Sequence, residues 1–320
     1  MITEQEISQI IHRLFPQAKI KQITPLQGWM NVAYKIDFFS EELNSVIIKP
    51  SRRKPARNVA KEEHVYEILH KHQLAAPHVY HLDTTRKYLD CDVLVIECLP
   101  GIKANDTWNT LNKKQKQRLI KNMAKYLAKM HTKCTFRQAG KFYANKTAYQ
   151  GTFKEMHLTN IQEGAEELRK QKVVDEQLIQ EAINTTKQYA HLIENIQPYC
   201  LTHMDFTLEN IFVDKNQNVT GVIDWEHAEI GINLWEFFQL QRWVFSKEKW
   251  IEEEFIAEYK KHAHIPNNWK EIVTYLRIQL DLKFVYRLIN TQQEKLAKEY
   301  IQKVREHIKK TNQITSRSKA

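Results

Sequence analysis

The spacing of apolar residues changes along the chain, and the change divides it into two parts. Near the start, apolar residues from Ile7 to Leu14 recur at helical spacing, and a T-x-x-E capping box opens the segment at Thr3. This pattern predicts an amphipathic helix that ends before Pro16. Apolar runs bounded by turn residues then predict strands at 20–23, 32–38, 45–49, 79–82, 87–89 and 93–97. With one helix expected at about 59–72, the first part is an antiparallel sheet with an embedded helix.

The second part, from residue 99 onward, has mostly helical periodicity. Its predicted helices lie at about 111–131, 155–170, 175–195, 233–245, 248–262, 268–290 and 293–309. One hairpin is the exception, formed by apolar strands at 211–213 and 219–223 around a polar turn. We therefore predict an α+β fold with two lobes. Residues 1–98 would form a lobe with an antiparallel sheet and one helix, and residues 99–320 a larger, mostly helical lobe.

Candidate chemistry gathers beside that hairpin. Asp205 is followed five residues later by Asn210, and Asp224 ends the second strand of the hairpin. The hairpin would place Asn210 and Asp224 at the same end. Phosphoryl transfer from Mg-ATP needs a carboxylate that faces the attacking hydroxyl, and an amide oxygen and a carboxylate that hold Mg²⁺. The order H-x-D-x-x-x-x-N, followed by an Asp borne on a strand, is typical of a kinase catalytic loop.

The same stretch resembles the aminoglycoside phosphotransferase family of small-molecule kinases, which includes choline-kinase-like enzymes and is distantly similar to protein kinases. The resemblance covers roughly residues 18–240 and is strongest in HMDFTLENIFVD and VTGVIDWE. It extends to the apolar helix Met123–His131 and to Val93–Gly101, which is similar to the linker between lobes in that family. The resemblance implies a bilobal protein-kinase-like fold, use of ATP and Mg²⁺, and transfer of the γ-phosphate to a hydroxyl of a small molecule.

The resemblance also implies roles for the residues of the catalytic loop. Asp205 is similar to the catalytic Asp that orients or deprotonates the acceptor hydroxyl. Asn210 and Asp224 are similar to the Mg²⁺ ligands. His203 resembles a structural His that holds the backbone of the same loop.

Residues of the first part complete the nucleotide site in that family. Lys49, at the end of an apolar strand, resembles the lysine that reaches the α- and β-phosphates. Its expected partner is Glu62 on the next helix, with Glu63 as the alternative. Gly28 and Asn31 belong to a segment similar to the loop that covers the ATP phosphates.

The linker and the segment after the second Asp supply the remaining expectations. The backbone around Glu97 to Leu99 would meet the adenine. Trp225 and Glu226 directly follow Asp224, which makes them candidates for contact with the acceptor.

Two departures from the family pattern affect these expectations. The phosphate loop has one glycine, Gly28, where relatives often have two or more, so backbone N–H contacts to phosphate are less assured. After Asp224, many relatives carry Gly-Asp-Pro and then an Asp that supports the catalytic loop. We expect Glu236 to take the place of that Asp, which puts this supporting contact in question and leaves the chemistry intact.

The overall composition limits other classes of function. A net charge of +10 is typical of nucleic-acid-binding proteins, but the lysines are spread along helices among glutamates. We therefore expect no nucleic-acid partner. The chain shows no signal-peptide pattern and no apolar stretch long enough to span a membrane, so we expect no membrane partner. Four cysteines without a C-x-x-C pair indicate a reducing cytoplasm.

Two alternatives to a small-molecule kinase stay open at this point. A protein kinase shares the catalytic loop, but the chain has no G-x-G-x-x-G, Asp-Phe-Gly or Ala-Pro-Glu motif. A non-catalytic nucleotide-binding or scaffold protein on the same fold is favoured by the single glycine of the phosphate loop. The acceptor stays open among antibiotics, amino alcohols, sugars and amino acids. The acidic run at 252–254 is better explained as a solvated helix face than as a pocket for a cation.

Overall fold

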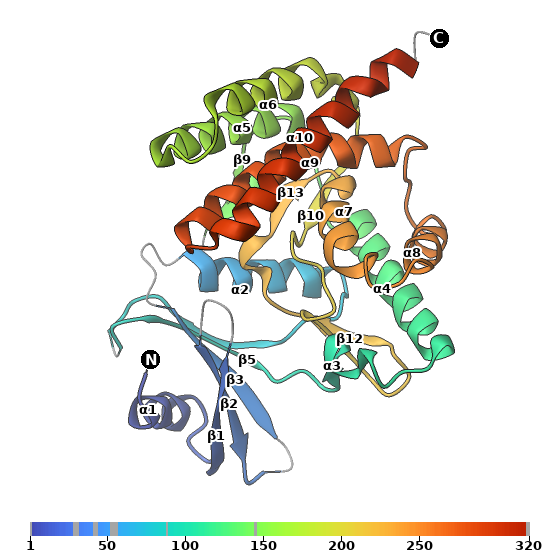
Figure 1. Cartoon of the computed structure of the whole chain (residues 1–320). Helices are drawn as coiled ribbons and strands as arrows, with labels where there is room; N and C mark the ends of the chain where they lie inside the picture. Colours follow the sequence, from blue (N-terminus) through green and yellow to red (C-terminus); the bar gives the residue numbers. More distant parts are fainter. Residues whose placement is uncertain are drawn as a thin grey trace.

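The first lobe is built around a five-stranded antiparallel sheet in the order β1-β2-β3-β5-β4 (Figure 1). The computed structural model describes residues 2–27, 32–40, 44–51, 57–87, 89–143 and 146–317. The strands are β1 (Ile20–Gln27), β2 (Val32–Phe38), β3 (Ser45–Ser51), β4 (Val79–Asp83) and β5 (Asp92–Glu97). The sequence pattern predicts this lobe correctly in its sheet and its embedded helix, and the predicted two-lobed α+β fold is confirmed.

Helices cover both faces of this sheet. The first is α1 (Glu4–Leu14), which begins with the predicted capping box at Thr3. It packs against the face that carries Val93 and Val95. The second is α2 (Arg57–Lys71), which packs against the face that carries Leu94 and Ile96. Because successive side chains of a strand point to opposite faces, β5 is buried on both sides.

One predicted strand of this lobe, at 87–89, is wrong. The Asp83 side chain accepts a hydrogen bond from Thr85 N–H at 2.8 Å, which forms a turn directly after β4. Arg86 follows with a positive φ of 56°. The chain thus reverses at once, and β4 pairs with β5 in antiparallel register. Residues 87 and 89 lie in bends, and residue 88 lies outside the described residues.

The second lobe is mostly helical. Its helices are α3 (Ala104–Trp108), α4 (Lys113–Lys133), α5 (Phe153–Gln171), α6 (Glu176–Gln188), α7 (Phe237–Gln239), α8 (Ile251–Tyr259), α9 (Trp269–Asn290) and α10 (Glu294–Arg317). Helices α5, α6, α9 and α10 share an apolar cluster of their own, apart from the main core. Within the part of the chain that the structure describes, no helix has both the length and the apolar character of a membrane span. The boundary of the lobes at residues 98 and 99 stays a prediction.

Two predicted helices of this lobe are shorter or more irregular than expected. The segment predicted as a helix at 175–195 divides into α6 and the 3₁₀ turn η1 (Ala190–Ile193). The segment predicted at 233–245 is a 3₁₀ turn η3 (Asn233–Glu236), then α7, then a π-helical turn η4 (Leu240–Val244). π-helical turns often occur at functional sites, and this one follows residues that contact the catalytic loop.

The expectation that a single hairpin is the only sheet structure of the second lobe is wrong. A second antiparallel sheet runs in the order β7-β10-β13-β8-β9. Its strands are β7 (Thr135–Phe136), β8 (Gly140–Tyr143), β9 (Lys146–Tyr149), β10 (Tyr199–Thr202) and β13 (Glu229–Gly231). They are too short to show a period of two, and pairings such as Leu201 with Ile230 join residues distant in the chain. The predicted hairpin is present as β11 (Ile211–Val213) and β12 (Val219–Val222), and β6 (Ile102–Lys103) adds a third strand.

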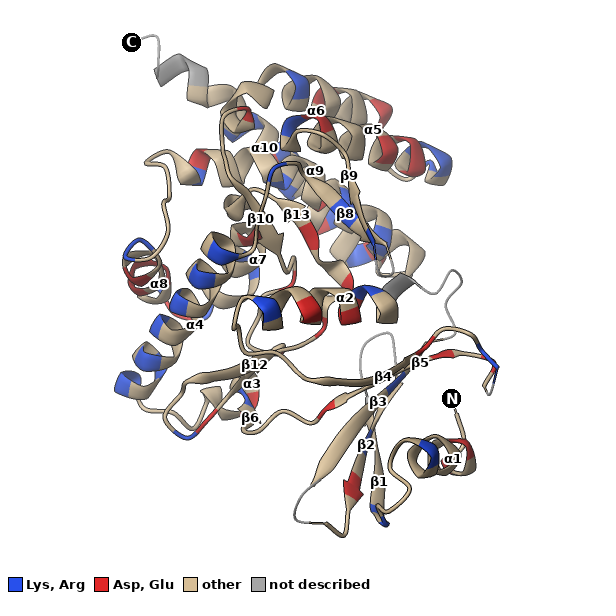
Figure 2. Cartoon of the chain, turned by 180° about the vertical axis from the view of Figure 1, so that it is seen from behind, with Lys and Arg blue, Asp and Glu red and all other residues tan. Residues whose placement is uncertain are grey.

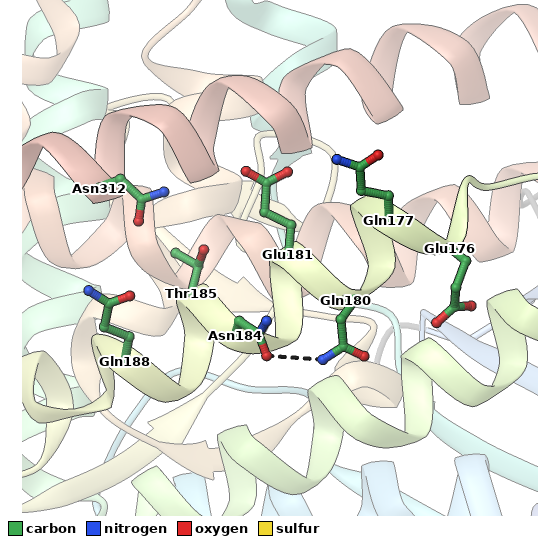
Figure 3. Close-up of a pocket in the computed structure, with 8 residues that line it drawn as sticks. All are labelled: Glu176, Gln177, Gln180, Glu181, Asn184, Thr185, Gln188 and Asn312. Carbon is green, nitrogen blue, oxygen red and sulfur yellow. Dashed lines mark hydrogen bonds between the residues drawn. The ribbon is translucent and has the colours of Figure 1, made fainter.

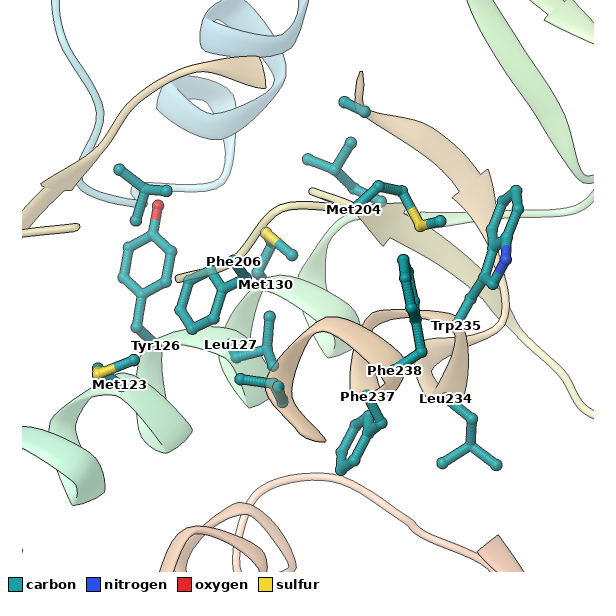
Figure 4. Packing of buried hydrophobic residues seen from close by; sticks show 14 of the residues in the cluster. Met123, Tyr126, Leu127, Met130, Met204, Phe206, Leu234, Trp235, Phe237 and Phe238 are labelled. Carbon is teal, nitrogen blue, oxygen red and sulfur yellow. The ribbon is translucent and has the colours of Figure 1, made fainter. Parts of the chain in front are cut away.

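The core lies directly beneath the candidate catalytic loop. Met204 and Phe206, the two neighbours of Asp205, are buried in the main apolar cluster. Figure 4 shows Phe206 on the side of Tyr126, from α4, and Met204 on the side of Trp235. The rings of Tyr126 and Phe206 stack with centroids 6.2 Å apart. Asp205 is therefore held by two apolar anchors, one on each side.

Candidate active site

The hairpin brings the two predicted metal ligands together. Strands β11 and β12 pair so that Ile211 faces Val222. Just beyond them, Ile223 N–H donates to the backbone oxygen of Asn210 at 2.9 Å. Asn210 and Asp224 therefore flank the same end of the hairpin, and this part of the prediction is confirmed.

The orientation of the Asn210 amide suits a metal ligand. Its nitrogen donates to the backbone oxygen of Asp205 at 3.0 Å and to the Asp205 carboxylate at 2.9 Å. This leaves the oxygen end of the amide for a cation. The Asp224 side chain is 42% exposed, and its backbone is left-handed, with φ 68° and ψ 56°. Mg²⁺ is bound through one or two protein oxygens plus substrate phosphates, so an amide oxygen and a carboxylate fit it.

Larger ligand sets are absent from the described residues. No group of three His, Cys, Asp or Glu side chains there could hold a metal ion. A structural zinc site needs four ligands, and such a site is not found in this part of the chain. The pair of oxygen ligands is thus the candidate metal site.

Lys49 forms a pair with Glu62, as the sequence predicts. Lys49 Nζ lies 2.7 Å from each carboxylate oxygen of Glu62, which resolves the choice between Glu62 and Glu63. The same Nζ lies 3.7 Å from Asp224 Oδ1, so the strand lysine also reaches the candidate metal site. Burial alone would lower the pKa of Lys49, but the two carboxylates outweigh burial and raise it. The lysine is therefore charged and held in place.

The backbone of the catalytic loop is fixed by His203. Its Nε2 donates to the backbone oxygen of Ile223 at 2.8 Å, and its Nδ1 accepts from Asp205 N–H at 3.2 Å. Burial lowers the pKa of His203 to about 4, so the ring is neutral and one tautomer serves both bonds. These contacts support the expected structural role of His203.

Glu236 anchors the same loop through its backbone. Its buried carboxylate accepts hydrogen bonds from the N–H groups of His203 at 2.6 Å, Met204 at 3.2 Å and Phe206 at 3.4 Å. Burial raises the pKa of Glu236 to about 7, against the effect of these three donors. The replacement of Asp by Glu put the support of the catalytic loop in question. Glu236 nevertheless provides this support, through three hydrogen bonds to the backbone of the loop.

Comparison with known proteins identifies the family of the chain. Residues 24–272 match the model of the Phosphotransferase enzyme family. The chain belongs to this family. A comparison with curated protein sequences finds no match.

Solved structures of similar fold include aminoglycoside phosphotransferases. A thermostable mutant of aminoglycoside phosphotransferase APH(4)-Ia in its apo form has a TM-score of 0.73 and 15% identity, covering 96% of this chain and 98% of that one. A ternary complex of the same enzyme with ADP and hygromycin B has a TM-score of 0.73 and 15% identity, with coverages of 95% and 98%. The streptomycin–ATP–APH(2″)-IIa ternary complex has a TM-score of 0.62 and 14% identity, with coverages of 95% and 99%. At these identities the likeness concerns the fold.

The remaining nucleotide-site residues of this phosphotransferase are less fully defined. Gly28 and Asn31, predicted to cover the phosphates, lie outside the described residues. Glu97 N–H donates to the backbone oxygen of His78 at 2.8 Å, so this N–H group is already used in a backbone hydrogen bond within the first lobe. Leu99 is buried against β12, since a Cβ at Gly221 would come within 2.5 Å of Leu99 Cδ1. The expected contact of the backbone around Glu97 to Leu99 with adenine stays a prediction.

Trp225 and Glu226 differ in their access to an acceptor. Trp225 is fully buried, its ring centroid lies 4.4 Å from that of His203, and its Nε1 donates to the backbone oxygen of Val222 at 2.9 Å. This burial argues against the expected contact of Trp225 with the acceptor. The Glu226 side chain is 10% exposed, and its backbone oxygen accepts from Lys61 Nζ at 2.8 Å.

Two residues of this site carry no signal in the sequence. Lys61 precedes Glu62 in α2 and contacts the segment after Asp224. Gln239 ends α7 and donates from Nε2 to Asp205 Oδ1 at 3.3 Å. Neither belongs to a motif, and a Lys or Gln in an amphipathic helix is ordinary. Only the tertiary structure shows them at the site.

The acidic run at 252–254 is part of a surface network of ion pairs. Glu254 lies 2.6 Å from Lys121 of α4, and Glu252 lies 2.5 Å from Lys270 of α9. Figure 2 shows basic residues along α4 and acidic residues on the neighbouring α8. The solvated-face interpretation of this run is therefore the one that the structure supports.

A separate groove lies along α6, away from this set of residues. It is lined by polar side chains of α6 between Glu176 and Gln188 and by Asn312 of α10 (Figure 3). Gln180 Nε2 donates to Asn184 Oδ1 at 3.0 Å within it. The groove shares no residue with the candidate active site.

Proposed function

We propose that this phosphotransferase moves the γ-phosphate of ATP to a hydroxyl of a small molecule. One observation carries the proposal. Lys49 Nζ lies 3.7 Å from the Asp224 carboxylate, and the Asn210 amide lies 2.9 Å from the Asp205 carboxylate. The hydrogen bond from Ile223 N–H to the Asn210 backbone oxygen joins these two pairs at the end of one hairpin. Phosphoryl transfer depends mainly on positioning and charge stabilisation, and this set provides both.

Asp205 is the residue that would face the acceptor hydroxyl. Burial raises the pKa of Asp205 to about 6, opposed by the hydrogen bond from Asn210. The carboxylate is then ionised at neutral pH and can accept a hydrogen bond or a proton from the hydroxyl. His203 and Glu236 hold the loop so that this carboxylate keeps its direction.

Asn210 and Asp224 are the residues that would hold Mg²⁺. Bound Mg²⁺ would neutralise charge on the phosphate oxygens. Lys49, fixed by Glu62, would hold the phosphates that are not transferred. The ADP of one solved relative and the ATP of another support a nucleoside triphosphate as donor.

The acceptor is proposed only as a small-molecule alcohol. Hygromycin B and streptomycin occupy the complexes of similar fold, which makes an aminoglycoside one candidate beside amino alcohols, sugars and amino acids. A protein acceptor is disfavoured, because the chain after Asp224 enters η2 (Trp225–His227) and β13 at once and leaves no room for a long activation loop. None of the four cysteines, all of which lie in the described part of the chain, is in a disulfide, and we include a cytoplasmic location in the proposal.

The test compares Asp205→Asn with the wild type. ATP consumption is measured against a panel of alcohols that includes hygromycin B, streptomycin, choline, simple sugars and serine, and Mg-ATP binding is measured by calorimetry. We expect Asp205→Asn to lower kcat by about a thousandfold or more while the Kd for Mg-ATP changes little. Asp90→Asn, at an exposed site, is the matched control.

Two outcomes would contradict the proposal. Full turnover in Asp205→Asn would remove this residue from the chemistry. Absence of Mg²⁺-dependent ATP binding, seen as equal thermal shifts with ATP alone and with Mg-ATP, would favour the scaffold alternative.

A further inference from the structure

Gln239 touches the candidate catalytic residue directly. Its Nε2 donates to Asp205 Oδ1 at 3.3 Å and to the backbone oxygen of Met204 at 3.0 Å. Both partners are acceptors, so the nitrogen end of the amide must face the loop. Asn210 donates to the other carboxylate oxygen of Asp205, so each oxygen has one amide donor.

The residue before Asp205 needs this support. Met204 has a φ of +65°, a left-handed conformation that is unfavourable for a residue with a side chain. Its N–H is held by Glu236, and its carbonyl oxygen by Gln239. The two residues lie three positions apart, at the ends of η3 and α7, and hold the two peptide groups on either side of the Met204 Cα.

The other end of the Gln239 amide gains nothing for stability. Gln239 Oε1 is buried and has no hydrogen-bond partner among the described residues. A buried acceptor without a partner costs folding free energy, which an apolar side chain of the same length avoids. The amide therefore acts through its nitrogen alone, and both hydrogen bonds of that nitrogen go to the loop that carries Asp205.

The turn that follows Gln239 is anchored to the neighbouring helices. The π-helical turn η4 begins at the next residue, and Arg242 within it forms a buried ion pair with Asp281 of α9. The Arg242 guanidinium also lies 4.6 Å from the Phe284 ring centroid and 4.7 Å from that of Tyr300. A donor fixed in this way loses little entropy when it orients a carboxylate.

We propose that Gln239 is a positioning residue for phosphoryl transfer, which orients the Asp205 carboxylate toward the acceptor hydroxyl through its amide nitrogen. The inference rests on the proposed function. Asn210 and Gln239 together donate a hydrogen bond to each oxygen of the Asp205 carboxylate. The carboxylate is therefore held in one orientation instead of rotating about its side-chain bond. A change at Gln239 should then affect the chemical step more than nucleotide binding or folding.

The experiment compares three variants with the wild type. Gln239→Met keeps the length but removes the donor, and Gln239→Glu keeps the shape but replaces the donor by a charge that repels Asp205. Gln279→Met is the matched control, since Gln279 lies in α9, outside the loop that carries Asp205, and is also buried with an Oε1 that has no hydrogen-bond partner among the described residues. The readouts are thermal unfolding, Kd for Mg-ATP, and kcat and KM with the best acceptor of the panel and with water as acceptor.

We expect Gln239→Met to lower kcat about ten- to hundredfold, with KM for Mg-ATP and the midpoint of unfolding close to those of Gln279→Met. Gln239→Glu should be slower still. A role in packing alone predicts the reverse, because Glu fits the space of Gln and would restore activity. Wild-type kcat in Gln239→Met would overturn the inference while the proposed function stands. A wild type that transfers phosphate to no acceptor would overturn both.

Discussion

At the scale of single residues, the position of Asp205 explains its acid–base character. Its neighbours Met204 and Phe206 are buried, and burial raises the pKa of the Asp205 carboxyl to about 6. The hydrogen bond from Asn210 limits this rise. A carboxylate with a pKa just below neutrality is ionised at working pH and is still a useful base.

This pKa predicts how activity depends on pH. The carboxylate must be ionised to receive the hydroxyl hydrogen, and protonation below about pH 6 removes that form. We expect kcat/KM for Mg-ATP, which reports the free enzyme, to fall about tenfold per pH unit below about pH 6. Initial rates between about pH 5 and pH 8 would measure it, with Mg-ATP affinity followed over the same range. A flat profile down to pH 5, with the protein still folded, would contradict the prediction.

At the scale of elements, α2 joins the sheet to the segment that follows the metal-site Asp. Two consecutive residues of the helix do this. Glu62 binds Lys49 of β3, and Lys61 donates to the backbone oxygen of Glu226 in η2. Burial lowers the pKa of Lys61 to about 8, opposed by nearby carboxylates, so the amine is mostly charged at neutral pH.

Removing the Lys61 amine should loosen this connection. Lys61→Met keeps the aliphatic stem and loses one charged hydrogen bond, which contributes about 1.5–3 kcal/mol. We expect kcat/KM for Mg-ATP to fall about tenfold or more. Lys71→Met, at an exposed position of the same helix, is the control. Equal kinetics in the two variants would show that the Lys61 contact does not support the site.

The elements also show what a single sequence can reveal. The strands of the first lobe and the long helices have enough repeats of period 2 or 3.6 for the pattern to be visible. Strands such as β7, which covers only Thr135 and Phe136, have too few, and long-range pairing with β10 creates them. The sequence predicts that Asp205, Asn210 and Asp224 lie together because they are close in the chain and flank one hairpin. Gln239 is not predictable in this way, because only folding brings it to Asp205.

At the scale of the whole molecule, Gly101 fixes the linker against the catalytic hairpin. It has a φ of +100°, and a Cβ there would lie 2.2 Å from the backbone oxygen of Val213 in β11. The next residue, Ile102, pairs with Val213 in the sheet. No side chain fits between Gly101 and the backbone of β11, so only glycine allows this close contact. The linker between the lobes is therefore held against the strand that follows Asn210.

Two glycine substitutions should therefore have opposite effects. Gly101→Ala meets both the positive φ and the backbone contact, and we expect it to lower the free energy of unfolding by about 2 kcal/mol or more and to reduce activity. Gly164 lies in α5, where an added Cβ meets nothing within 4 Å. We expect Gly164→Ala to raise the free energy of unfolding by about 0.5–1 kcal/mol. Urea unfolding measures both. A neutral Gly101→Ala would mean that the linker can move away from β11.

The burial of Trp225 has a practical consequence. The indole ring sits against His203, one residue after Asp224, where a metal and a nucleotide would bring new charge. Tryptophan emission responds to the electric field around the ring, so this side chain is a built-in optical probe of the catalytic edge. The chain has seven tryptophans, and the difference between the wild type and Trp225→Phe isolates the signal of this one. Arrival of the nucleotide could then be followed by fluorescence without an attached dye.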